Sequence, residues 1–152
     1  WWPQEYEIDE QVREDLDHWQ HEEGVDFLGA DGPRRFAVTH AEATAALEHF
    51  ITHRLATFGP HEDSVLTQDW SMSHSLLSVP MNLGLLDPWH VVTAAADAYA
   101  QGQAPINSVE GFIRQIIGWR DYIWHLYWHF GEDYLRRNAL DARTPVPAWY
   151  TL

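Results

Sequence analysis

The sequence contains neither cysteine nor lysine, and both absences limit what the chain can do. Without cysteine it can form no disulfide, no cysteine-ligated zinc site and no iron–sulfur cluster of its own. Without lysine, nine arginines stand against 23 acidic residues, and the net charge is −14. An evenly acidic surface repels nucleic acid phosphates, so the composition alone argues against DNA binding. The paired candidates for a local basic patch are Arg34–Arg35 and Arg136–Arg137.

The sequence also has no long apolar run and no signal peptide. No stretch approaches the ~20 apolar residues needed to cross a bilayer, and no cleavable leader pattern opens the chain. We therefore expect no membrane partner and a cytoplasmic location. The first residue is Trp1 rather than methionine, which indicates a piece of a longer chain. With 45% hydrophobic and 21% charged residues, the composition is that of a globular domain.

Helical periodicity runs through the chain, and no alternating strand pattern accompanies it. Asp87–Pro88 has the signature of a helix start, Gly59–Pro60 that of a helix end, and Asn107 or Ser108 that of a cap. These signals predict an all-α fold, a bundle of about six helices joined by short loops. The expected helices cover residues 7–22, 40–57, 67–83, 88–100, 109–130 and 132–138.

Nine tryptophans are the most unusual feature of the composition. Packing in a core is the favoured explanation, and a pocket that stacks a flat ligand is the alternative. The histidine pairs His18/His21 and His125/His129 have spacings that can hold a metal on a helix. Ten histidines make such pairs frequent by chance, so we predict no metal site. No nucleophile–histidine–acid signature is present, and we predict no catalytic residue in the chain.

The segment His74–Ser78 (HSLLS) is the first candidate binding motif. Small hydroxyls and exposed backbone N–H groups near a helix end can donate hydrogen bonds to phosphate oxygens. The alternative is that Ser75 and Ser78 only bond to backbone carbonyls within a helix.

The long helix expected at 109–130 carries the second motif. Phe112, Gln115 or Ile116, Trp119, Tyr122 and Ile123 recur at spacings of three and four, with Arg120 beside them. An arginine next to an aromatic face can pair with phosphate or stack on a ring. An ordinary buried helix, with Arg120 in a surface ion pair, is the alternative and the better explanation of this motif taken alone.

Together the two motifs resemble the photolyase and cryptochrome family. Leu77–Ser78, Gly84 and Leu86-Asp-Pro88 follow the order of the family's flavin phosphate motif, and residues 112–122 (FIRQIIGWRDY) resemble its tryptophan–arginine–acid–aromatic helix. The likeness is greatest to the bacterial branch of (6-4) photolyases and cryptochromes that carry an iron–sulfur cluster. It extends over residues 34–152, including Arg35-Phe, Val38–Thr39 and Phe58-Gly-Pro60. Val79 departs from the pattern, because the branch places proline directly after the serine.

The resemblance implies a role for each matched residue. Residues 34–152 would be the N-terminal part of the helical FAD-binding domain, preceded at 1–33 by a linker-like helix and loop. Ile116, Tyr122 and Ile123 would face DNA, and Trp149 and Tyr150 would transfer electrons. The residues expected to bind FAD are His74, Ser75, Leu76, Leu77, Ser78, Phe112, Gln115, Trp119 and Arg120.

Several parts of that family have no counterpart in this sequence. The antenna domain, the later stretch that contacts the flavin ring, the lesion-binding histidines and the cluster cysteines are all missing. We therefore expect a fragment of a flavoprotein that repairs damaged DNA with light, inactive alone and weak or lacking in FAD binding. A non-enzymatic helical interaction module and a blue-light-sensing cryptochrome stay open as alternatives. Self-association is expected through Trp1–Trp2, the aromatic face of the long helix or Trp149–Tyr150.

Overall fold

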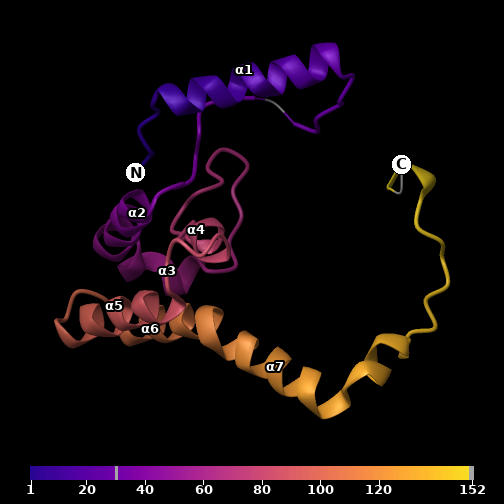
Figure 1. Ribbon diagram of the computed structural model, residues 1–152. Helices are drawn as coiled ribbons and strands as arrows, with labels where there is room; N and C mark the ends of the chain where they lie inside the picture. The colour runs from indigo at the N-terminus through magenta and orange to yellow at the C-terminus, as the bar shows by residue number, and fades with distance from the viewer. Residues whose placement is uncertain (30, 151–152) are drawn as a thin grey trace. The chain divides into compact units, whose positions relative to one another are not determined.

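The computed structural model describes residues 1–29 and 31–150, and every regular element in these ranges is helical (Figure 1). The prediction of an all-α fold is confirmed. The chain divides into two compact units, Trp1–Ile116 and Ile117–Leu152. The α-helices are α1 Glu7–Glu22, α2 His40–His53, α3 Leu55–His61, α4 Ser78–Asn82, α5 Pro88–Ala100, α6 Ile106–Ile113 and α7 Trp119–Phe130. The π-helix η1 covers Arg114–Gly118, and the 3₁₀ helices η2 and η3 cover Glu132–Arg136 and Ala148–Tyr150.

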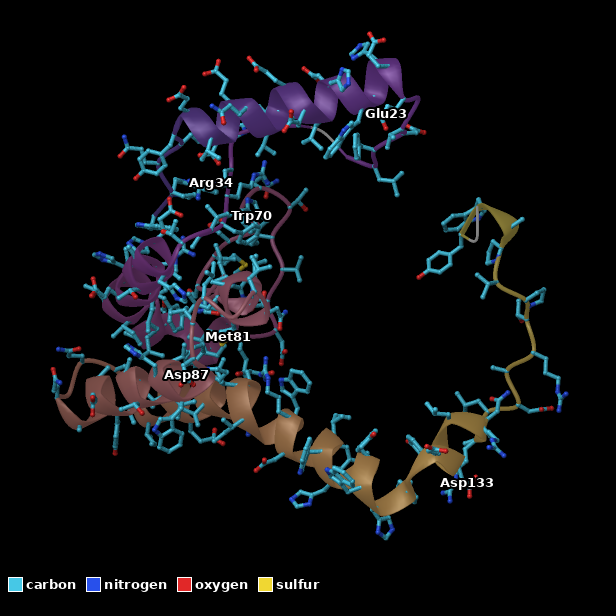
Figure 2. The ribbon with its side chains drawn as sticks, in the orientation of Figure 1. Glu23, Arg34, Trp70, Met81, Asp87 and Asp133 are labelled. Carbon is cyan, nitrogen blue, oxygen red and sulfur yellow. The ribbon has the colours of Figure 1, made fainter. Side chains whose placement is uncertain are left out.

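Helices α1 and α5 have the bounds expected from the sequence, because local signals define their starts. A carboxylate oxygen of Asp87 accepts a hydrogen bond from the Trp89 N–H at 2.8 Å, and Pro88 occupies the first helical position (Figure 2). None of the helices in the described residues is long and apolar enough to span a membrane.

The helix predicted for 40–57 is wrong in its second half. It breaks at Arg54, and α3 then continues through Gly59–Pro60 instead of stopping there. Proline has no N–H for the carbonyl of Ala56, and that carbonyl accepts the Ser108 hydroxyl instead, at 3.1 Å. The same hydroxyl oxygen accepts the Gly59 N–H at 3.0 Å. The bridge through Ser108 thus lets a proline lie inside a helix.

Ser108 is therefore not the helix cap that the sequence indicates. It is fully buried, and α6 begins two residues earlier, after Pro105. Gly59 allows this close packing of α3 against α6, because a Cβ there would lie 2.9 Å from the Ser108 Cα.

The helix predicted for 67–83 is also wrong, since only Ser78–Asn82 is helical. A carboxylate oxygen of Asp69 accepts hydrogen bonds from the N–H and hydroxyl of Ser71 and from the N–H of Met72. Met72 and Leu76 then adopt positive φ angles of 36° and 58°, which a helix does not allow. The residues between this turn and α4 therefore form a loop, without the backbone hydrogen bonds of a helix.

Phenylalanine and aliphatic residues form the core of the first unit. The rings of Phe50, Phe58 and Phe112 pack together, with the centroids of Phe50 and Phe112 4.6 Å apart. All three rings are buried. The core position favoured for the tryptophans is wrong, because none of the nine is buried in the structure.

The long helix predicted for 109–130 is a succession of three elements. It starts at Ile106, passes through the π-helix and continues as α7. Gly131, with φ of 60°, ends it as expected. The short helix predicted after Gly131 is a 3₁₀ helix. Residues 117–150, all of which the structure describes, contain no buried side chain.

Candidate functional site

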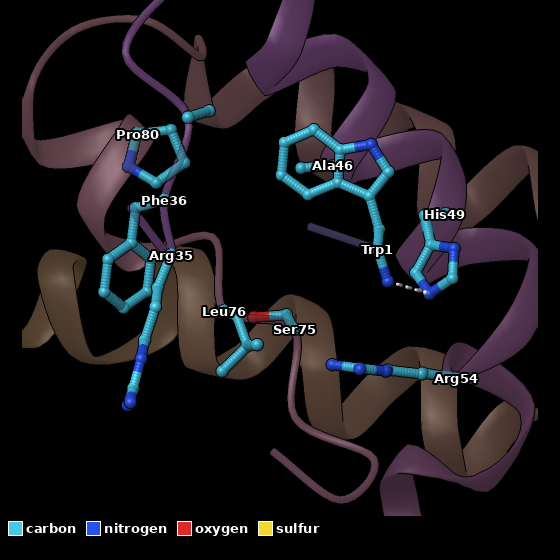
Figure 3. A pocket seen from close by; sticks show the side chains of 10 residues that line it. Trp1, Arg35, Phe36, Ala46, His49, Arg54, Ser75, Leu76 and Pro80 are labelled. Carbon is cyan, nitrogen blue, oxygen red and sulfur yellow. Dashed lines mark hydrogen bonds between the residues drawn. The ribbon is translucent and has the colours of Figure 1, made fainter. Parts of the chain in front are cut away.

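A cavity in the first unit brings together side chains from four parts of the chain (Figure 3). They come from the N-terminus, the segment before α2, helix α2 with its C-cap, and the loop that leads into α4. Ser75 and Leu76 of the first sequence motif are among them. The lining residues are Trp1, Arg35, Phe36, Ala37, Ala46, His49, Arg54, Ser75, Leu76 and Pro80.

Arg54 is positioned by the break between α2 and α3. Its Nη1 donates a hydrogen bond to the His74 carbonyl at 3.1 Å, which fixes the guanidinium beside the loop of the first motif. In Figure 3 the guanidinium points towards Ser75. The Ser75 hydroxyl oxygen accepts a long hydrogen bond from the Leu77 N–H at 3.4 Å. Arginine and hydroxyl donors directed into one cavity are the groups that bind phosphate oxygens.

Positive charge is concentrated here although the chain as a whole is acidic. The pKa of His49 is lowered by burial and then by the N-terminal amine, His53 and Arg54. The amine of Trp1 lies 3.2 Å from His49 Nε2, and the rings of His49 and His53 are 4.5 Å apart. Independently of the terminal amine, Arg35 and Arg54 give the cavity wall two positive charges, so the cavity favours a negative ligand.

The size of the cavity limits what it can hold. Its volume is about 20 Å³, room for about one water molecule, and the Trp1 indole lies beside Ala46 at its wall (Figure 3). Sites for drug-sized or cofactor-sized ligands have volumes of roughly 300–1,000 Å³. The donor groups fit a phosphate, but the cavity in this form has no room for a flavin ring.

The rest of the first motif lies outside the cavity lining. Leu77 is a core residue, and Ser78 is exposed at the first position of α4. The Nε2 atom of His74 lies 3.2 Å from the Ser64 carbonyl oxygen.

In the second motif, the first-unit residues differ in exposure. Phe112 and Ile116 are buried, at 1% and 4% exposure, whereas Gln115 is exposed. Phe112 is fully enclosed by core rings, and Ile116 has almost no surface to present to DNA.

The second-unit candidates are exposed. Trp119 is 51% exposed, and the Arg120 guanidinium carbon lies 4.5 Å from the centroid of its ring. Tyr122 and Ile123 are also more than half exposed. In η3, the rings of Trp149–Tyr150 are 5.9 Å apart and largely solvent-exposed.

Two groups of the cavity wall, the neutral-favouring imidazole of His49 and the guanidinium of Arg54, were not found by sequence reasoning. A continuous helix over 40–57 makes both of them ordinary helix residues, and no local signal marks the break at Arg54. The sequence marks Arg35 as half of a basic pair and as part of the family resemblance, but not as a cavity residue. Its guanidinium carbon lies 5.6 Å from the centroid of the Trp70 ring.

No protein-family model matches the chain. Over 115 residues the chain is 48% identical to the (6-4) photolyase of Agrobacterium fabrum, which covers 76% of this chain and 23% of that protein. Over 92 residues it is 30% identical to the uncharacterized protein R853 of Acanthamoeba polyphaga mimivirus, 60% of this chain and 70% of that protein.

Fold and site together define an all-helical domain with a small cavity lined by two arginines and a serine. The similarity to the photolyase then gives the family: the chain belongs to the photolyase-related proteins. It spans about a quarter of the photolyase that it matches.

Proposed function

We propose that this chain is the N-terminal part of a helical FAD-binding domain, formed by residues 34–152 and preceded by the helix and loop of 1–33. In the intact protein, reduced FAD would supply an electron to a pyrimidine photoproduct in damaged DNA under light. Such an enzyme would act on DNA in the cytoplasm. The observation that carries the proposal is the meeting of Arg35, Arg54 and Ser75 at one cavity, in a chain 48% identical to a (6-4) photolyase.

In this proposal, the segment His74–Ser78 lies along the FAD phosphates. Ser75 and Arg54 would donate hydrogen bonds to phosphate oxygens, and Arg35 would add positive charge. Of the other residues that the resemblance implies for FAD, Gln115 in the first unit and Trp119 and Arg120 in the second are not buried and stay proposals, whereas the Phe112 ring is enclosed in the core and would act only as a support. Tyr122 and Ile123, which are more than half exposed, make up the proposed DNA-facing set, and Trp149–Tyr150 the proposed electron-transfer pair, whereas Ile116 is buried and leaves the DNA-facing set.

The chain by itself is expected to bind FAD weakly and to repair nothing. At about 20 Å³ the cavity has no room for FAD in this form, and we predict no catalytic acid or base for repair in the chain. Equilibrium dialysis with FAD measures the first point. Retention of one FAD per chain through purification would contradict it.

The phosphate site can be tested separately with pyrophosphate as the probe. We expect isothermal titration to detect binding, and Arg54→Met to weaken it by about tenfold or more, since a charge-assisted hydrogen bond is lost. Arg143→Met is the matched control, because Arg143 is 81% exposed in its side chain and lies in the second unit. Arg54→Lys keeps the charge and should recover part of the affinity. Equal affinity of wild type and Arg54→Met would refute the site.

A second candidate function is that of an interaction module, and the exposed aromatic face of α7 favours it. Trp124 and Trp128 are 61% and 65% exposed. An apolar face of this kind promotes self-association. Sedimentation velocity over a concentration series should detect oligomers that Trp128→Glu reduces. The control is Trp89→Glu in α5, where the ring is 70% exposed. A monomer at high concentration would exclude self-association through this face.

Repair and light sensing are separated by an assay on the full-length protein. A defined (6-4) lesion in a short duplex should be reversed under blue light by a photolyase and left intact by a cryptochrome.

A further inference from the structure

Helix α1 presents an apolar stripe that nothing in the first unit covers. Ile8, Val12 and Trp19 are 62%, 50% and 44% exposed, and Leu16 is half-buried between them. Their spacing of four, four and three residues places them on one side of the helix. Part of this stripe forms one wall of a groove of about 340 Å³. The groove, here called the α1 groove, is lined by Ile8, Asp9, Val12, Arg13, Leu16, Asp31, Gly32, Arg34 and Val38.

Arg34 joins the N-terminal turn of α1 to α2 (Figure 2). Its Nε donates to Asp9 in α1 at 2.7 Å, and its Nη1 and Nη2 donate to the two oxygens of Glu42 in α2, each at 2.9 Å. Nη2 also donates to the Gln4 carbonyl at 2.7 Å. These side chains are only 12% exposed. The ion pairs hold the start of the stripe in a defined place, which a docking surface requires.

Negative charge predominates on α1, although the charged residues that line the groove itself pair with one another, Asp9 with Arg34 and Asp31 with Arg13. Seven of the 16 residues of α1 are Asp or Glu, and its one arginine, Arg13, pairs with Glu5 and Asp31. Asp15 and Glu23 stand four residues before and after Trp19, on the side of the stripe. A ligand that covers the stripe therefore meets carboxylates at its edges.

We propose that the α1 groove binds an amphipathic helix of a partner protein, with leucine-type residues on one face and lysine or arginine along its borders. The apolar face of such a helix would cover Ile8, Val12 and Leu16. Its basic borders would pair with the carboxylates at the edges of the stripe, Asp15 and Glu23. A second copy of this chain fits poorly, because each copy carries a net charge of −14 and the two copies would repel each other. Nucleic acid is disfavoured for the same reason. The proposal does not depend on the flavin site.

The test uses the full chain and a designed helical peptide with leucines at i, i+3, i+4 and i+7 and lysines on either side. Fluorescence anisotropy should show saturable binding that weakens by about tenfold or more when salt is raised from about 0.05 to 0.5 M. A peptide with glutamates in place of the lysines, and a scrambled peptide of the same composition, should bind at least about tenfold more weakly. Equal binding of the lysine and scrambled peptides would overturn the proposal.

Ile8→Asp and Leu83→Asp locate the binding surface. Both side chains are 62% exposed, but only Ile8 lines the groove. An acid in the first turn of α1 is compatible with the helix, so Ile8→Asp should keep the circular dichroism spectrum of the wild type. It should weaken peptide binding by about tenfold, and Leu83→Asp should not change it. Unchanged affinity of a folded Ile8→Asp variant would overturn the proposal, as would self-association that Ile8→Asp abolishes.

Discussion

The two units differ in what covers their apolar side chains. In Trp1–Ile116, buried phenylalanines and aliphatic residues pack into a core. In Ile117–Leu152, the residues up to 150 include several tryptophans and tyrosines, yet none of their side chains is buried. Hydrophobic content alone therefore does not make a core. Rings must be enclosed from several sides before they contribute the free energy of burial.

Local contacts are what the second unit has instead. The rings of Phe130 and Tyr134 stack with centroids 4.9 Å apart, and the Arg137 guanidinium carbon lies 4.6 Å from the centroid of the Phe130 ring. Contacts between near neighbours stabilise a helix by only a few tenths of a kcal/mol each, about 0.2–0.5 kcal/mol. Helix α7 continues from α6 and η1 and so needs no nucleus of its own, but none of its side chains is buried, so packing adds little to its stability. We conclude that α7 depends on a covering partner, and the first unit does not.

The largest effect is expected for Phe112→Ala. The ring is 1% exposed and packs against Phe50 and Phe58, so its removal leaves a cavity in the core of the first unit. The free energy of unfolding, measured by urea denaturation, should fall by about 3–5 kcal/mol. Phe112→Leu fills much of the same space and should lower it by about 1 kcal/mol. A loss below about 1 kcal/mol for the alanine variant would show that the first unit has no tight core.

The next effect in size is expected for Gly59→Ala, at the contact of α3 with α6. The added Cβ would lie 2.9 Å from the Ser108 Cα, a backbone atom that cannot move alone. The free energy of unfolding should fall by about 1–3 kcal/mol. Gly32→Ala is the control, because nothing lies within 4 Å of its Cβ and its φ is not positive. If both variants unfold at the same urea concentration, the close packing of these helices is disproved.

Acid should weaken the first unit through Glu42. The hydrogen bond from Arg34 lowers the pKa of this carboxyl below its ordinary value of 4.5. Its contribution to stability is therefore complete above that pH and is lost as the pH falls below it. Glu42→Gln should lower the free energy of unfolding at pH 7 by about 1–2 kcal/mol and flatten its decline between pH 5 and 3.

The matched pair in the second unit should behave differently. Asp133 and Arg136 lie 4.0 Å apart with side chains 84% and 81% exposed. A pair this exposed contributes almost nothing, so Asp133→Asn should leave the urea midpoint unchanged at pH 7. A shift as large as that of Glu42→Gln would show that exposure does not distinguish the two units.

Local signals explain which parts of this fold can be predicted from the sequence. Asp87–Pro88 and the regular spacing of α1 are complete within a few residues, and both helices have the expected bounds. Gly59–Pro60 was misread because its compensation, the Ser108 hydroxyl, lies 49 residues after Gly59. The turn that replaces the helix at 67–77 depends on one side chain, Asp69, whose effect the periodicity of its neighbours obscures.

The candidate site was predictable to the extent that a motif marks it. The order of residues around Ser75 indicated a phosphate-binding motif near a helix end, and Ser75 and Leu76 do line a cavity, but in a loop where a helix was predicted. Arg54 and His49 come from a different helix, so their place at the cavity depends on tertiary packing. Sequence spacing could not predict that these two side chains lie beside the loop. The helix break that directs the Arg54 side chain to the cavity has no side-chain cap, so no local signal marks it.

The smallest effect is expected for Trp124→Ala in α7, and it is the sharpest test of the difference between the units. The ring is 61% exposed, and its described ring contact is an edge-on pair with Trp128, with centroids 5.5 Å apart. Removing it should change the free energy of unfolding by no more than about 0.5 kcal/mol, measured at low protein concentration so that association does not contribute. If the free energy of unfolding fell by about 2 kcal/mol or more, the Trp124 ring would have to be buried by other residues. That result would mean that α7 is packed in the isolated chain, and the proposed need for a covering partner would then be withdrawn.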